Sequence, residues 1–134
     1  MAETQQRLED RRPLSPHLQI YRPTLTMTMS IVHRITGAAL YGAFFLLAWY
    51  FIAAAAGPEA FVWASWTLTS IPGLIILFGA TWALFTHLLG GLRHAIWDTG
   101  AAMDEKGREA LALATAIGGV ALTLLVWFAA FSLR

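Results

Sequence analysis

Three long apolar runs limit what this chain can fold into. They occupy residues 35–56, 60–92 and 110–133, and none contains Asp, Glu, Lys or Arg. A helix of about 20 residues spans the hydrocarbon core of a bilayer, and helices satisfy their own backbone hydrogen bonds there. The runs therefore predict an all-α membrane protein with three transmembrane helices, at about residues 24–56, 70–97 and 108–132. A cytoplasmic segment, residues 1–23, is expected to precede this anchor domain.

The second run is longer than one membrane span requires. Its early part is rich in Trp, Ser and Thr, which suits the membrane–water interface. We expect the spanning helix to begin near Ser70, with Pro72 in its first turn, where proline is tolerated. The first helix is expected to begin just after Pro23, which suits the first helical position.

The positive charges predict the orientation of the chain. Of the nine Lys and Arg residues, all except Arg134 lie in the N-terminal segment, at the start of the first helix or around the second loop: Arg7, Arg11, Arg12, Arg22, Arg34, Arg93, Lys106 and Arg108. The positive-inside rule then places the N-terminus in the cytoplasm and the C-terminus in the periplasm.

The beginning of the chain does not resemble a targeting sequence, because Glu3, Glu9 and Asp10 are interspersed with arginines. We therefore expect insertion through the first helix, as a multi-pass protein of a bacterial inner membrane. The net charge of +1 gives no sign of a nucleic-acid partner. The chain has no cysteine, which excludes disulfides and thiolate-ligated iron–sulfur clusters.

His87 is predicted to lie near the middle of the membrane, about 16 Å from the cytoplasmic end of its helix. A titratable residue at that depth suggests a function, although a neutral histidine bonded to a neighbouring helix would also explain it. His87, Gly90, Gly91 and His94 share one helix face. The two glycines leave room either for a planar macrocycle such as haem, which imidazole ligates, or for close helix packing.

A haem held by two histidines needs a second imidazole at the same depth on the opposite face of the ring. His94 is on the same side of the same helix as His87. His33 is expected at the cytoplasmic edge, too shallow to meet His87, and His17 precedes the membrane. The second axial ligand is therefore expected from another chain.

A second polar cluster is predicted at the start of the first helix, where Ser30, His33 and Arg34 have i, i+3, i+4 spacing. Arg93 and His94 are expected at a comparable depth. Such donors suit a quinone carbonyl or haem propionates. Arginines that reach toward lipid headgroups are the alternative explanation.

The motifs RPLSPHLQIYRP (residues 12–23), SIVHRITG (30–37) and HLLGGLRHAIWD (87–98) resemble the cytochrome b membrane-anchor subunit of succinate dehydrogenase, the larger anchor of respiratory complex II. The resemblance covers nearly the whole chain. It implies a hetero-oligomeric helix bundle formed with a second small anchor subunit, and docking of an iron–sulfur subunit that carries the flavoprotein. Because the chain has no ligands for these cofactors, it is not expected to oxidise succinate alone.

The resemblance also implies the roles of individual residues. His87 matches the ligand of haem b, whose second ligand comes from the partner anchor. Ser30 and Arg34 match the ubiquinone site, and His33, Arg34 and His94 match the haem propionate region. Two other functions stay open: a fumarate reductase anchor running the reverse reaction, and a structural three-helix membrane protein with no redox role.

Overall fold

The computed structural model describes residues 21–133, and this part of the chain is helical without strands. The helices are α2 (Leu25–Ala56), α3 (Pro58–Thr69), α4 (Ile71–Asp98) and α5 (Glu105–Ser132). Helices α2, α4 and α5, of 32, 28 and 28 residues, are long and apolar enough to cross a membrane. The predicted all-α fold with three transmembrane helices is confirmed. The cytoplasmic segment was predicted at residues 1–23. Its residues 1–20 lie outside the described part of the chain.

Side-chain caps fix where the long helices begin. The Thr24 hydroxyl accepts a hydrogen bond from the amide of Met27, so α2 starts at Leu25. Pro23 therefore precedes the cap, and its predicted place at the first helical position is wrong. Ser70 caps α4 in the same way, with Pro72 in the first turn as predicted.

The interfacial part of the second run forms a separate short helix, α3, which the sequence pattern did not separate from α4. Ser70 breaks the two apart because its backbone is extended (φ −63°, ψ 159°). Gly73 allows this tight corner, since a Cβ there would collide with the carbonyl oxygens of Thr67 and Leu68. Trp63 and Trp66 are each 64% exposed on α3, which suits a helix at the membrane surface.

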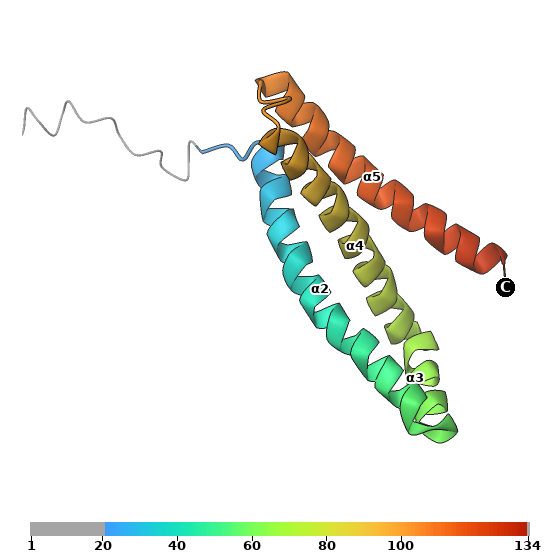
Figure 1. Cartoon of the computed structure of the whole chain (residues 1–134). Coiled ribbons are helices and arrows are strands. Elements are labelled where there is room, and N and C mark those ends of the chain that lie inside the picture. The colour runs from blue at the N-terminus through green and yellow to red at the C-terminus, as the bar shows by residue number, and fades with distance from the viewer. Residues whose placement is uncertain (1–20, 134) are drawn as a thin grey trace, which may run out of the picture.

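The helices are arranged so that the start of α2, the end of α4 and the start of α5 lie at the same end of the molecule. Helices α2 and α4 run antiparallel and side by side, and α5 packs on α4 at an inclination to this pair (Figure 1). The start of α2 meets the start of α5, where Thr24, Met27 and Arg108 line a common pocket. The described Lys and Arg residues lie at this end of the molecule, on or next to the first three turns of α2, the last turns of α4 and the first turn of α5.

The interior is thin and built from small residues. Ala83, Ala112 and Thr123 are buried between helices, and Thr86 occupies the space left by the missing side chain of Gly119. Small residues at helix interfaces are typical of membrane bundles. Most large apolar side chains are exposed, among them Phe44 and Phe128 at 72% and 75%. This surface is consistent with a transmembrane subunit of a larger complex.

Candidate functional site

The His87 ring is held by helix α2, so its two nitrogens have different surroundings. Nδ1 lies 3.1 Å from the backbone oxygen of His33 and 3.4 Å from the hydroxyl of Thr36. A carbonyl oxygen only accepts hydrogen bonds, so Nδ1 must carry the proton and donate it. The lone pair is then on Nε2. Histidines that ligate metals commonly have this arrangement, with the second ring nitrogen bonded to a backbone carbonyl.

The free nitrogen of His87 is open to the surface of the chain. Nε2 has no hydrogen-bond partner among residues 21–133, and it is not one of the buried unpartnered atoms. The ring rests against Gly37 of α2, where an added Cβ would lie 3.0 Å from Cε1. Helix α2 therefore fixes the orientation of the ring and leaves Nε2 without a partner among the described residues.

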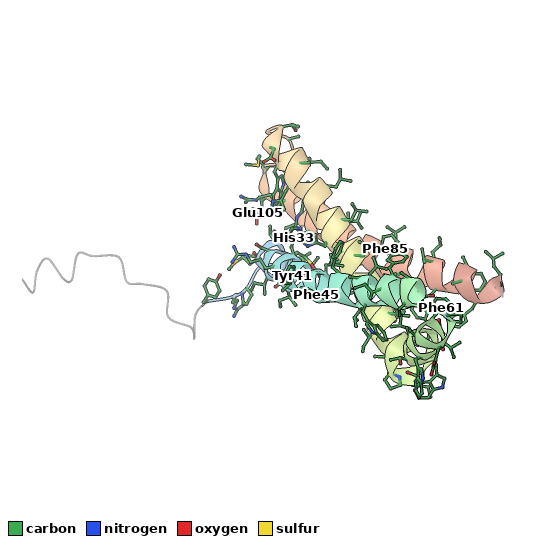
Figure 2. The ribbon with its side chains drawn as sticks, turned by 60° about the horizontal axis from the view of Figure 1, so that its bottom comes forward. His33, Tyr41, Phe45, Phe61, Phe85 and Glu105 are labelled. Carbon is green, nitrogen blue, oxygen red and sulfur yellow. The ribbon has the colours of Figure 1, made fainter. Side chains whose placement is uncertain are left out.

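His33 lies on α2 (Figure 2), and its ring is stacked directly against that of His87. The two ring centroids are 4.0 Å apart and the rings are nearly parallel, at 8°. The expectation that His33 is too shallow to meet His87 is wrong. With α2 starting at Leu25, close to its predicted start, His33 is already about 12 Å into the helix. His87 is about 16 Å from the other end of α4, so their depths nearly match.

The stacking nevertheless prevents the two histidines from sharing one iron. An imidazole nitrogen binds a metal along its lone pair, in the plane of the ring. Two parallel rings stacked face to face place their lone pairs in separate planes. Residues 21–133 contain no group of three or more His, Asp or Glu side chains placed to hold a metal ion. His33 and His87 therefore cannot ligate the same iron, and a second ligand from another chain stays a prediction.

Gly90 and Gly91 have different surroundings, although they are neighbours. A Cβ on Gly90 would collide with the His33 ring, so this glycine serves close packing of α2 on α4. A Cβ on Gly91 would meet nothing within 4 Å. Close helix packing therefore explains Gly90, whereas room for a haem at Gly91 stays a prediction.

Three further side chains complete a polar cluster toward the C-terminal end of α4. The His94 ring lies 5.2 Å from His33 and 5.3 Å from Trp97 between centroids. The guanidinium of Arg93 lies 5.1 Å from the Trp97 ring centroid, and Arg93 is only 2% exposed. Its three side-chain nitrogens, the Trp97 indole nitrogen and Nε2 of His33 are buried and have no hydrogen-bond partner within residues 21–133.

The predicted quinone residues lie one turn apart on α2, but outside this buried cluster. Ser30 is half-buried and Arg34 is exposed, and neither side chain makes a hydrogen bond or ion pair with the described residues. His17 is outside the described residues. Sequence reasoning missed the roles of Thr36, Gly37 and Trp97. The first two fall three and four residues after His33, a spacing that signals a shared helix face.

Known proteins resemble this chain over most of its length. The family described as "Succinate dehydrogenase/Fumarate reductase transmembrane subunit" matches residues 9–128. The chain is 46% identical to the succinate dehydrogenase cytochrome b556 subunit of Paracoccus denitrificans over 121 residues, which cover 87% of this chain and 92% of that protein. It is 37% identical to the cytochrome b556 subunit of Rickettsia bellii, covering 95% and 99%. The chain therefore belongs to the family of succinate dehydrogenase and fumarate reductase transmembrane subunits.

Proposed function

We propose that this chain is the larger anchor of succinate:ubiquinone oxidoreductase and that it holds one side of haem b through Nε2 of His87. The observation that carries the proposal is the orientation of His87. Its Nδ1 is bonded 3.1 Å from the His33 carbonyl, and Nε2 is open toward the outside of the chain. A structural histidine would be expected to use both nitrogens inside the bundle.

The surroundings of His87 fit a haem. Gly91, one turn further along α4, leaves space for a flat ring beside the imidazole. His33 and His94 lie toward the cytoplasmic end, on the side where the propionates are expected, and Arg34 is expected to join them. The haem supplies reversible one-electron storage when it is bound. A partner anchor subunit would supply the second ligand, because His33 is stacked on His87 and cannot share its iron.

Ser30 and Arg34 are the proposed quinone-binding residues. They lie one turn apart on α2, and their side chains are free of hydrogen bonds to the described residues. The Arg34 guanidinium can donate to a quinone carbonyl, and its charge favours the oxygen as it gains electron density. The Ser30 hydroxyl can donate a second hydrogen bond that positions the ring. Both residues are near the end of the helices where water can deliver protons.

The proposed partners are the second anchor, an iron–sulfur subunit and a flavoprotein. A chain without cysteine has no thiolate ligands for an iron–sulfur cluster, so electrons must come from another subunit. The positively charged end of the bundle is proposed to face the cytoplasm and to receive that subunit. The chain alone is therefore proposed to be inactive toward succinate, and its broad apolar surface suits the second anchor and lipid.

The test is a reduced-minus-oxidised absorption spectrum of the complex that copurifies with this chain from membranes. The proposal expects low-spin b-type bands together with the flavoprotein and iron–sulfur subunits. Succinate should reduce ubiquinone in this preparation. A preparation without a Soret band and without quinone-dependent activity would favour the structural three-helix protein. Rapid fumarate reduction by a low-potential quinol, with slow succinate oxidation, would favour a fumarate reductase anchor.

A further inference from the structure

Arg93 is the one fully buried cation in the described part of the chain, and nothing there balances its charge. It is 2% exposed, and Nε and both terminal nitrogens have no partner. None of the described carboxylates forms an ion pair with it. The Trp97 ring at 5.1 Å offers a cation–π contact, which is worth less than the cost of burying an unpaired charge. A further group must therefore bind the guanidinium in the assembled protein.

The chemistry of that group follows from its neighbours. An arginine side chain only donates hydrogen bonds, and so does the indole nitrogen of Trp97, which is also buried and unpartnered. Two adjacent unpartnered donors, one of them permanently charged, require an acceptor that carries negative charge. A carboxylate fits best, because its two oxygens match the planar fork of a guanidinium.

We propose that Arg93, assisted by the indole N–H of Trp97, binds a haem propionate, which gives the haem an anchor inside α4 beyond the predicted contacts of Arg34, His33 and His94. This inference rests on the proposed function. Arg93 lies about 9 Å along α4 from His87 toward the cytoplasmic end, a separation comparable with that between a haem iron and its propionate carboxyls. Since the three nitrogens are closed off in the chain alone, the flexible Arg93 side chain must turn outward past Trp97 to reach the propionate.

The experiment uses the assembled complex, produced without haem in a strain that cannot synthesise it. It is titrated with protohaem and with protohaem dimethyl ester, in which both propionates are neutral. The wild-type complex should bind the ester at least tenfold more weakly than the acid. Arg93→Gln should bind protohaem roughly tenfold to a hundredfold more weakly, as expected when a charge-assisted hydrogen bond is lost. Its preference for the acid over the ester should fall by a similar factor.

Two further variants keep the test decisive. Arg108→Gln, the same substitution at the same end of the molecule, should keep the wild-type preference for the acid. Trp97→Phe keeps the ring but removes the N–H donor, and it should weaken protohaem severalfold while leaving the ester unchanged. If the Arg93→Gln complex does not assemble, the Trp97→Phe variant alone tests the inference.

If both Arg93→Gln and Trp97→Phe keep the wild-type preference for protohaem over its dimethyl ester, the inference is overturned. The anion that binds Arg93 would then be a side-chain carboxylate of a partner subunit or a lipid phosphate. A wild-type complex that binds neither haem would instead refute the proposed function, and the inference with it.

Discussion

A single methyl group at Gly90 should disturb the site, whereas the same change elsewhere on α4 should not. In Gly90→Ala the new Cβ would collide with the His33 ring, with Nε2 at 3.0 Å and Cγ at 3.2 Å among the nearest atoms. The His33 ring has little room to tilt, because it is already stacked on His87 at 4.0 Å. Overpacking of this kind costs about 1–3 kcal/mol. Replacing a helical glycine with alanine stabilises the helix by about 0.5–1 kcal/mol, so the net loss of stability is roughly 0–2.5 kcal/mol.

Gly79→Ala is the matched control, because a Cβ at Gly79 on the same helix meets nothing within 4 Å. The two variants share the gain in helix propensity, so their difference isolates the collision. Thermal unfolding of the solubilised complex, followed by tryptophan fluorescence at one scan rate, should give a clearly lower midpoint for Gly90→Ala than for Gly79→Ala. The haem bands should also shift in Gly90→Ala only. Equal midpoints and identical spectra would refute the packing of His33 against Gly90.

Arg34→Leu should slow succinate–quinone reductase activity about tenfold to a hundredfold, while electron transfer from succinate to a water-soluble dye stays normal. Ser30→Ala should mainly raise KM for the quinone. Full quinone activity in both variants of an assembled complex would mean that the quinone binds elsewhere. For the topology, a reporter enzyme that works only in the periplasm should be active when fused after Arg134. Activity of a cytoplasm-only reporter at that position would contradict the predicted orientation.

The sequence predicted the helices well because their signals are local. Long uncharged runs require membrane-spanning helices, and Ser70 and Pro72 mark the start of α4 as expected. The short helix α3 was missed because its residues belong to the same uncharged run as α4. Only the extended backbone at Ser70 separates the two helices. A hydropathy pattern cannot predict this, because it contains no information on backbone dihedral angles.

The candidate site was predicted in its residues but not in its contacts. His33 was placed at the cytoplasmic edge of the first helix, although that helix was expected to start near residue 24, so the stacking of His33 on His87 was missed. The different surroundings of Gly90 and Gly91 depend on how α4 is rotated against α2. That rotation is set by packing between helices, which the spacing of residues along one helix does not determine.

The central claim is that Nε2 of His87 ligates the haem iron, and the low-spin b-type spectrum of histidine variants tests it most directly. In the assembled complex, His87→Ala should lose this spectrum, and added imidazole should restore part of it by occupying the vacated space. His94→Ala should keep the low-spin bands with a smaller change, because His94 is exposed and nearer the C-terminal end of α4. An unchanged low-spin spectrum in His87→Ala, with the haem lost in His94→Ala, would contradict the assignment of the ligand.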